Sequence, residues 1–488
     1  MGLSGSLVKL GLELGRLKTG TPPRLLRRSI DFSKTEKQAG DDPVPYFTFW
    51  KDDLFHMEHP RPGTAESVFH VEQTGGSDSP SHSEHSRRLG GHASASLYPP
   101  GSILAKIGGQ LPCYITYTTD ATAELIRDNL HKSPLYSGVI QGVGPRYCPS
   151  IEDKIVKFPE KERQQIFLEP EGIATDEFYV NGFSTSLPFE VQVELVRTII
   201  GCEHAEILRP AYAVEYDFAF PTQLGPSLET KVCRNLYLAG QINGTSGYEE
   251  AAAQGLMAGI NAARRVRGLE PIVFRRDQAY IGVLIDDLVT KGTVEPYRMF
   301  TSRAEYRLLL RQDNADLRLS ETGHQLGLLP ERNYRQFTDK RNAIEAEILR
   351  LETTRQDGDT LAQRLRRPEI DYKSLSSINQ LLSDELIQQV EIAIKYAGYI
   401  ARQEGEVAKF RNLEDKQIPD GFDYTSVPSL RNEARQKFLK IRPATLGQAA
   451  RISGVSPADI SILMVWLKRS APRNEAAGKP EPATRPQQ

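Results

Sequence analysis

The chain has few sulfur-containing residues, few tryptophans and no excess of charge of either sign. Its 488 residues include four Cys, five Met and two Trp, and 61 basic side chains nearly balance 63 acidic ones. The cysteines are far apart and form no CxxC pair, which argues against a disulfide framework or a cysteine-based zinc site and favours a reducing compartment. The formal net charge of −2 excludes a binder that works by bulk positive charge. No apolar run approaches the roughly 18 residues of a membrane span.

Composition changes several times along the chain. Length alone allows about three domains of roughly 150 residues. Residues 51–110 are rich in Ser, Gly, Pro and His without hydrophobic periodicity. This predicts a disordered insert rather than a metal site, since the histidines lack helical pairing. From there to residue 270, strand-like runs such as 113–117 and 165–168 alternate with helical ones, as in an α/β domain. Residues 271–470 are mainly helical, and 471–488 are predicted to be a disordered tail.

The strongest local pattern lies between residues 235 and 265. An apolar segment, Leu236 to Ala239, is predicted to form a buried strand that leads into a glycine turn, and a helix is predicted to begin near Tyr248. The turn contains Gly240, Gly244 and Gly247. Glycines let backbone N–H groups approach a phosphate, and a helix N-terminus carries partial positive charge. A glycine turn alone is common in α/β crossovers, but the strand, turn and small-residue helix together favour a nucleotide site.

A second pattern surrounds Cys148 with charged residues. Arg146 lies two residues before the thiol and Lys154 six after it, and nearby cations lower the pKa of a thiol and make it a better nucleophile. Glu152 and Asp153 would act in the opposite direction or transfer protons. A cysteine is more often an inert buried residue than a nucleophile, so both interpretations stay open on the residues alone.

A third pattern, residues 295–319, interleaves arginines with aromatic side chains. If the segment is helical, Arg303, Arg307 and Arg311 share one face, which suits phosphate contacts and base stacking. Nearby acidic residues make an internally paired structural face equally plausible, and local alternation also permits a strand. Near the C-terminus, residues 446–452 and 458–468 predict two helices joined by a Gly- and Pro-containing turn.

These segments resemble the tRNA uridine 5-carboxymethylaminomethyl modification flavoenzymes, also called the glucose-inhibited division protein A family. The resemblance rests on long motifs: RLKTGTPPRL, GVGPRYCPSIEDK, FLEPEG, YVNGFSTSLP, NLYLAGQINGTSGYEEAAAQG, YIGVLIDDLVTKG and ARISGVSPADISILMVWLK. It covers almost the whole chain except residues 51–110 and the tail. It implies an α/β fold, with an incomplete FAD-binding (glutathione-reductase-like) Rossmann-type domain that holds an inserted domain, followed by an α-helical C-terminal domain.

The resemblance also implies an activity and a domain plan. The family modifies C5 of the wobble uridine, position 34, in certain tRNAs, together with a tRNA-modification GTPase. It uses FAD, NADH and methylenetetrahydrofolate, and homodimers are expected. Mitochondrial members install a 5-taurinomethyl group, and a mitochondrial location follows here by resemblance only. Residues 1–50 would be a remnant of the FAD and insertion domains, 111–270 the nicotinamide- and FAD-binding region, and 271–470 the region that binds tRNA and the partner.

Site residues follow from the same motifs, position by position. Cys148 matches a cysteine considered catalytic, and Gln241 matches a glutamine that contacts FAD. The glycine turn beside it would lie against the flavin nucleotide, through Gly240, Gly244, Thr245 and Gly247. The residues of the nicotinamide-nucleotide segment are Gly144, Pro145, Arg146, Tyr147, Asp153 and Lys154. The candidate tRNA-binding residues are Arg298, Arg303, Arg307 and Arg311. No metal site is expected.

The sequence departs from the family in one important respect. Family members begin with a strand–GxGxxG–helix unit that binds the FAD pyrophosphate, and no such motif occurs here. We therefore expect an N-terminally truncated form. Three hypotheses follow: a working tRNA-modifying flavoenzyme, a non-catalytic form that binds tRNA or the GTPase only, and an unrelated FAD-dependent oxidoreductase.

Overall fold

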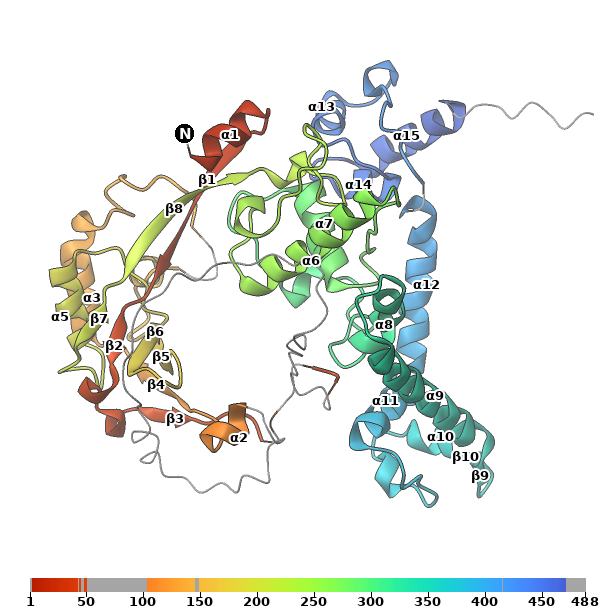
Figure 1. The fold of residues 1–488 in the computed structure, drawn as a ribbon, viewed down its shortest axis with the longest axis horizontal. Coiled ribbons are helices and arrows are strands. Elements are labelled where there is room, and N and C mark those ends of the chain that lie inside the picture. Colours follow the sequence, from red (N-terminus) through yellow and green to blue (C-terminus); the bar gives the residue numbers. More distant parts are fainter. Residues whose placement is uncertain are drawn as a thin grey trace, which may run out of the picture. The chain divides into compact units, whose positions relative to one another are not determined.

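A computed structural model describes residues 2–42, 44, 48–50, 103–144, 149–414 and 416–470 (Figure 1). The chain divides into two compact units, which we call the sheet unit (residues 18–215) and the helical unit (residues 1–17 and 216–488). It passes from one unit to the other within β1 (Leu14–Thr21) and within β8 (Tyr212–Ala219), and these two strands pair with each other. The mixture of strands and helices agrees with the expected α/β class.

The sheet unit is built on a six-stranded sheet in which every neighbouring pair is antiparallel. The predicted strands at 113–117 and 165–168 are confirmed and lie next to each other. The spatial order is β3 (Glu36–Gln38), β4 (Cys113–Tyr117), β5 (Gln165–Pro170), β6 (Glu177–Asn181), β2 (Arg24–Leu26) and β7 (Ile207–Arg209). Alternation along β5 buries Ile166 and Leu168, so this strand contributes its apolar side chains to the core.

Helices complete the sheet unit. They are α2 (Ile103–Ile107), α3 (Asp120–Asn129), α4 (Ile151–Lys157) and α5 (Phe189–Arg197). Helices α3 and α5 lie side by side (Figure 1), and Ile126, Leu195 and Val196 reach the apolar core from them. Helix α2 falls inside the stretch 51–110, so the expectation of a disordered insert is wrong for residues 103–107. Residues 51–102 lie outside the described residues.

The helical unit begins with α1 (Leu3–Lys9) and continues after β8 with α6 (Tyr248–Val266) and α7 (Tyr280–Lys291). The predicted helix start at Tyr248 is confirmed. Buried side chains of these helices, including Met257 and Ile285, pack with Leu7 and Leu238 into one apolar cluster. Helix α7 is almost wholly buried: nine of its 12 residues are inaccessible to solvent.

The rest of the helical unit is mainly α-helical, as predicted for residues 271–470. Its elements are α8 (Ala315–Gln325), α9 (Glu331–Thr353), the short hairpin of β9 (Arg355–Gln356) and β10 (Asp359–Thr360), α10 (Leu361–Leu365), α11 (Asp384–Lys395), α12 (Ala397–Glu414), α13 (Asn432–Ile441), α14 (Leu446–Arg451) and α15 (Pro457–Ser470). The last pair confirms the predicted helix–turn–helix. Two separate apolar clusters hold these elements, one around α9 to α11 and one around α13 to α15. The tail, 471–488, lies outside the described residues.

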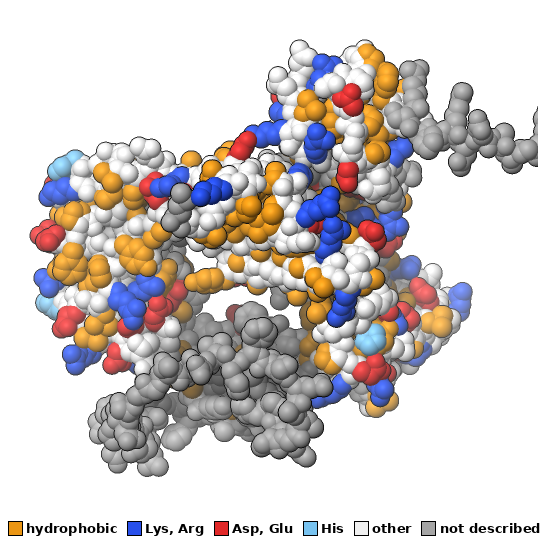
Figure 2. All heavy atoms as spheres, turned by 45° about the horizontal axis from the view of Figure 1, so that its top comes forward, with side chains coloured by type: hydrophobic (Ala, Val, Ile, Leu, Met, Phe, Trp, Pro, Cys, Tyr) orange, Lys and Arg blue, Asp and Glu red, His pale blue; other side chains and the backbone are white. Residues whose placement is uncertain are grey.

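The surface carries both signs of charge. On the face shown in Figure 2, Lys and Arg side chains lie among acidic and apolar ones rather than in one continuous field, as the near-zero net charge leads one to expect. Within the described residues, no helix combines the length and apolar character that crossing a bilayer requires.

Candidate cofactor and tRNA site

The glycine turn leads into α6 but does not follow a strand. Residues 236–239 make only one isolated bridge, between Tyr237 and Glu229, so the predicted strand is wrong. Apolar character was a correct sign of burial for Leu238. Residues 228–230 lie beside this segment and share two backbone hydrogen bonds with it, but the pairing ends after a single bridge and no strand forms. The chain then forms a single 3₁₀ turn, Gly240–Asn243, before α6.

Internal packing accounts for the glycines of this turn. Gly240 and Gly244 adopt φ of 78° and 81°, values that favour glycine. A Cβ on Gly244 would lie 2.7 Å from Thr293 Cγ2, and one on Gly247 would lie 1.7 Å from Glu250 Oε2. Each glycine is thus required by the protein itself, so the glycine pattern alone is not a sign of a phosphate.

The inside of the turn is filled by the buried side chain of Gln254. Its Oε1 accepts hydrogen bonds from the Gly240 N–H (3.2 Å) and from Asn243 Nδ2 (2.9 Å), and its Nε2 donates to Thr245 Oγ1 (3.0 Å). A phosphate therefore has no room on this side of the turn. Asn243 Oδ1 is buried and accepts no hydrogen bond from the described residues, which leaves one acceptor that a ligand donor could satisfy.

The open side of this region is the start of α6. Gly247, its N-cap, has no side-chain cap, so the first N–H groups of a 19-residue helix are available to an anion or a polar ligand. Gln241 is exposed beside this end, and Tyr248 is 91% exposed. These residues could hold a flavin nucleotide at the N-terminus of α6, with Gln241 as a polar contact. They fit this position better than one inside the glycine turn.

The arginine-rich segment is neither a helix nor a strand. It contains one 3₁₀ turn, Thr301–Arg303, followed by turns up to the start of α8, so the expected common face of three arginines is wrong. Burial of Tyr297, Ala304 and Leu310 in two small apolar clusters outweighs the helix propensity of this segment.

Three of the four candidate arginines are paired with acidic side chains. Arg298 contacts Glu250 (3.2 Å), Arg311 contacts Asp313 (3.1 Å), and Arg303 lies 3.9 Å from Asp287 with its guanidinium over the Tyr297 ring. For these three arginines, the contacts therefore favour the alternative of an internally paired structural face. Arg307 differs, because it is exposed and its guanidinium donates to the Thr301 hydroxyl (2.6 Å) rather than to an acid.

The structure brings the glycine turn and the arginine segment together. The Tyr297 N–H donates to the Gly244 carbonyl (2.8 Å), and Thr245 forms a parallel bridge with Tyr297. The Met299 N–H donates to Glu250 Oε1 (2.9 Å) at the start of α6. The sequence does not predict this contact, because more than 40 residues separate the two segments and neither has the periodicity of a paired strand.

The candidate nicotinamide segment lies in the sheet unit, around the start of α4. Ser150 caps this helix by accepting from the Asp153 N–H (3.2 Å), and Asp153 also accepts from the Tyr136 hydroxyl (3.0 Å). Lys154 donates to the Gly182 carbonyl (2.8 Å). Gly144 lies against the Lys18 side chain. Pro145, Arg146, Tyr147 and Cys148 lie outside the described residues, so the nucleophile assignment stays a prediction.

Two of the three described cysteines, Cys113 and Cys202, do not resemble nucleophiles. Cys202 is buried, and its burial, with a smaller contribution from Glu203, raises the pKa of its thiol to about 12. Burial likewise raises the pKa of Cys113, although this side chain is partly exposed on β4. Among the described residues, no three His, Cys, Asp or Glu side chains gather closely enough to hold a metal ion.

Two acidic sites are buried: Glu152, which the sequence analysis named only as a charged neighbour of Cys148, and an acidic pair on α7, which it missed. Glu152 is fully buried in the sheet unit, where its Oε1 accepts from Ser133, Thr185 and Ser186. Asp286 and Asp287 are buried on α7. The signal for the second was available: an Asp pair interrupts an otherwise apolar helix, and buried carboxylates need partners.

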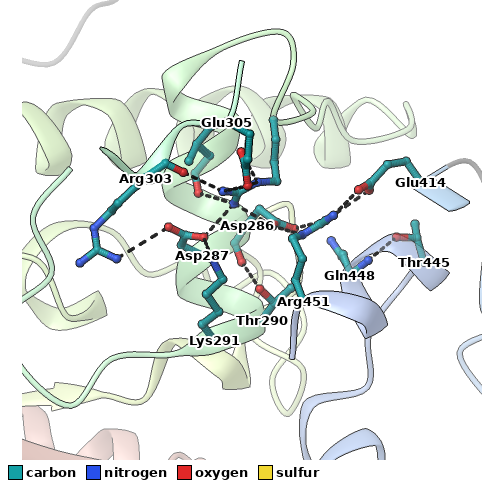
Figure 3. A network of polar contacts seen from close by, with 12 residues as sticks. Asp286, Asp287, Thr290, Lys291, Arg303, Glu305, Glu414, Thr445, Gln448 and Arg451 are labelled. Carbon is teal, nitrogen blue, oxygen red and sulfur yellow. Dashed lines mark hydrogen bonds and ion pairs between the residues drawn. The ribbon is translucent and has the colours of Figure 1, made fainter. Parts of the chain in front are cut away.

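The partners of the α7 acids come from distant segments (Figure 3). Arg276 Nη1 donates to Asp287 (2.7 Å) and to Asp286 (3.1 Å), and its other nitrogens donate to Glu305. From α14, Arg451 donates two hydrogen bonds to Asp286 (2.6 and 2.8 Å). Burial opposes ionisation of Asp287, but Arg276 and Lys291 outweigh it and hold its pKa below the usual range. Arg276 and Arg451 stay charged because their acidic partners outweigh the effect of burial on the pKa.

Comparison with known proteins places the chain in one family. The model described as glucose inhibited division protein A matches residues 1–67 and 100–270. Two models of the C-terminal region of the tRNA modifying enzyme MnmG/GidA match residues 331–404, the helical domain, and 406–488, the helical bundle. The first match skips residues 68–99, a narrower gap than the insert expected at 51–110.

Named relatives and solved structures agree with these models. The tRNA uridine 5-carboxymethylaminomethyl modification enzymes MnmG of Geobacter sulfurreducens and Protochlamydia amoebophila are each 52% identical over 96% of this chain, which covers 70% and 68% of their lengths. Two crystal forms of Aquifex aeolicus GidA match with a TM-score of 0.78, at 44% and 46% identity, over 96% of this chain and 69% and 70% of theirs. The chain is thus a member of the FAD-dependent GidA/MnmG family of tRNA uridine modification enzymes.

Proposed function

We propose that this chain acts in the modification of wobble uridine 34 of tRNA, installing a 5-carboxymethylaminomethyl-type or 5-taurinomethyl group. The observation that carries the proposal is its 52% identity, over 96% of its length, to an enzyme named for this product. FAD, NADH and methylenetetrahydrofolate would be the cofactors and co-substrate, with a tRNA-modification GTPase as partner. When bound, a flavin supplies the redox chemistry that such a one-carbon transfer requires.

The chain's own residues would hold the flavin at the start of α6. The exposed Gln241 and the uncapped first turn of the helix offer donors to it, and Thr245 and the glycine turn fix their position through Gln254. In the sheet unit, Asp153 and Lys154 on α4 belong to the expected nicotinamide segment. Because Gln254 fills the inside of the turn, we do not assign the pyrophosphate to the glycines.

Cys148 is proposed as the nucleophile. Its thiolate would add to C6 of the uridine, which makes C5 enolate-like and able to form a bond to the one-carbon unit. Loss of the C5 proton then allows the thiolate to leave C6. The described cysteines Cys113 and Cys202 are poor candidates for this role, since burial raises the pKa of both thiols.

For tRNA, the contacts favour Arg307 over the other three candidates. Its guanidinium is exposed and is not neutralised by an acid in the described part of the chain, so it is available to a phosphate. We expect Arg307→Ala to weaken tRNA binding about threefold to tenfold and to lower the salt dependence of the affinity, because one phosphate contact is lost. Arg311→Ala, which removes an arginine already paired with Asp313, is the matched control and should change affinity less.

Flavin binding distinguishes the working enzyme from a non-catalytic form that binds only tRNA or the GTPase. The absence of a strand–GxGxxG–helix motif from the sequence favours the second candidate. We expect the purified chain to bind FAD weakly or not at all, and to bind undermodified tRNA. A fluorescence titration with FAD and a filter-binding assay with tRNA measure the two properties separately, and saturable micromolar flavin binding would contradict this expectation.

Activity is tested by incubating the chain with undermodified tRNA, FAD, NADH, methylenetetrahydrofolate, glycine and a tRNA-modification GTPase. Mass spectrometry of the digested tRNA reports the modified nucleoside. In a full-length context that carries the FAD-pyrophosphate motif, Cys148→Ser should abolish the product while leaving tRNA binding unchanged, with Cys233→Ser as the matched control. Product formation by Cys148→Ser at the normal rate would remove the nucleophile assignment. A homodimer and a mitochondrial location are further proposals, tested by light scattering and by imaging of the tagged chain.

A further inference from the structure

A continuous series of buried polar contacts starts at the glycine turn. The backbone of Tyr297 is bonded to Gly244, and its hydroxyl donates to Asp287 Oδ2 (2.9 Å). Tyr297 is 3% exposed and Asp287 is 1% exposed, so water does not compete for this bond. One residue thus ties the turn at the proposed flavin side to the acidic pair of α7.

The series continues to the C-terminal bundle through two arginines. Arg276 joins Asp287 to Asp286. Figure 3 shows the next step, in which Arg451 joins Asp286 to Glu414 at the end of α12. Arg451 belongs to the C-terminal bundle of residues 406–488. The path therefore runs from the turn to the region that its family model describes as the C-terminal helical bundle, entirely within the helical unit.

Close packing positions the charges on both sides of this path. A Cβ on Gly282 of α7 would lie 2.4 Å from the Arg275 carbonyl, so glycine lets the segment that carries Arg276 cross directly over the helix. A Cβ on Gly447 would lie 2.4 Å from the Glu414 carboxylate carbon. Because these contacts leave no spare space, the bundle docks on α7 in one arrangement and cannot shift gradually to neighbouring ones.

The network is held by mutual neutralisation. Its acids are Asp286, Asp287, Glu305 and Glu414, and its cations are Arg276, Lys291, Arg303 and Arg451. Removing one member leaves a buried charge without its partner, which is strongly unfavourable. Release of Arg451 would therefore oblige Asp286 and Arg276 to rearrange, and the change would reach Asp287 and Tyr297.

We propose that this network couples the docking of the C-terminal bundle to the order of the glycine turn. With Arg451 on Asp286 the turn is held in place, and when the bundle is displaced the turn loosens. If the two are coupled, a ligand that orders the glycine turn also favours docking of the C-terminal bundle. A ligand that holds the bundle in its docked position likewise favours an ordered turn. The identity of those ligands, flavin at the turn and tRNA at the bundle, rests on the proposed function, whereas the coupling is a property of the contacts themselves.

Hydrogen exchange measured by mass spectrometry on the chain without ligands tests the coupling. We expect Arg451→Met to speed exchange in peptides covering residues 240–250 and 280–291 by about tenfold or more. Arg431→Met is the matched control: it also removes an arginine that pairs with a buried carboxylate, Asp459, but within the bundle. It should loosen residues 453–463 and leave the turn unchanged.

A double-mutant comparison distinguishes coupling from general loosening. Tyr297→Phe removes only the hydroxyl that joins the turn to Asp287. In that background, Arg451→Met should change exchange at residues 240–250 by less than about twofold, because the path is already broken. Equal effects of Arg451→Met in both backgrounds, or no effect on the turn in either, would overturn the proposal. Because no flavin or tRNA is present, neither result depends on the proposed function.

Discussion

The two units of the chain are stabilised in different ways. The sheet unit has one continuous apolar core, to which its central strands and helices contribute. Among its described residues, one acid, Glu152, is fully buried and is bonded by neutral donors. The helical unit has several smaller apolar clusters, and charged side chains lie buried where its segments meet on α7. Apolar packing therefore holds the sheet unit together, whereas in the helical unit charge balance is added to apolar packing where the segments meet on α7.

This difference bears on what each unit can do. An apolar core loses stability in proportion to the atoms removed and responds little to ions. A buried ion network gives little net stability over an apolar equivalent, but it is costly to break at any one member. The helical unit is thus suited to switching between discrete arrangements, and the sheet unit to holding one shape.

The largest expected effect comes from removing the central cation of the network. Arg276→Met should lower the free energy of unfolding of the helical unit by about 3–5 kcal/mol, because Asp286 and Asp287 lose their shared partner in a buried site. Urea unfolding followed by hydrogen exchange of the α7 peptides measures the loss.

Arg275→Met is the control for this variant. Arg275 is the adjacent arginine, and it pairs with Asp277 at a side-chain exposure of 33%. Its replacement should cost at most about 1 kcal/mol, as for other accessible ion pairs. Equal losses for the two variants would show that buried charge balance is not what holds this unit.

A smaller effect is expected at Asp459 in the C-terminal bundle. Its carboxylate accepts from Arg431 (2.6 Å) and from the Ser456 N–H and hydroxyl (2.9 and 2.7 Å). Asp459→Asn should cost about 1.5–3 kcal/mol at pH 7, the range for hydrogen bonds to a charged group. Circular dichroism during urea unfolding gives the value.

The pH dependence of the same variant supplies a second measurement. The hydrogen bonds from Arg431 and Ser456 outweigh burial and hold the pKa of Asp459 below its usual value. A depressed folded-state pKa contributes stability above the unfolded value of about 3.9, and that contribution is lost as the pH falls towards the folded value. Asp459→Asn should therefore flatten the loss of stability below about pH 4, and an unchanged acid limb would contradict the assignment.

The same contrast explains what the sequence could predict. The strands β4 and β5, the start of α6 and the final helix–turn–helix were predicted correctly, because local residue preferences indicate each of them. The strand predicted at 236–239 was wrong, and the helix or strand that the residues allowed at 295–319 does not form before α8. The backbones of Tyr297 and Met299 instead bond to Gly244 and Glu250, partners far along the chain that no local period specifies.

The motifs identified the family correctly, but they were a poorer guide to the arrangement of the site residues. The glycines of the turn were interpreted as a phosphate cradle, whereas Gln254, Thr293 and Glu250 show that packing requires them. Likewise, arginines spaced for a common helical face are mostly paired with acids. A residue type indicates which chemistry is possible, but the available space and the neighbouring charges decide whether a ligand can use it.

The smallest expected change in stability concerns Glu152, the buried acid of the sheet unit. Glu152 Oε1 accepts from Thr185 (2.9 Å) and from Ser186 N (3.1 Å), while Oε2 has no partner in the described part of the chain. Glu152→Gln keeps the acceptor and removes the charge, so it should change stability by less than about 1 kcal/mol, whereas Glu152→Leu leaves the donors unpaired and should cost about 1–3 kcal/mol. If the glutamine variant is as unstable as the leucine variant in urea unfolding, the charge of Glu152 itself stabilises this core. Buried charge would then stabilise both units, and the contrast between them would be smaller than their contacts indicate.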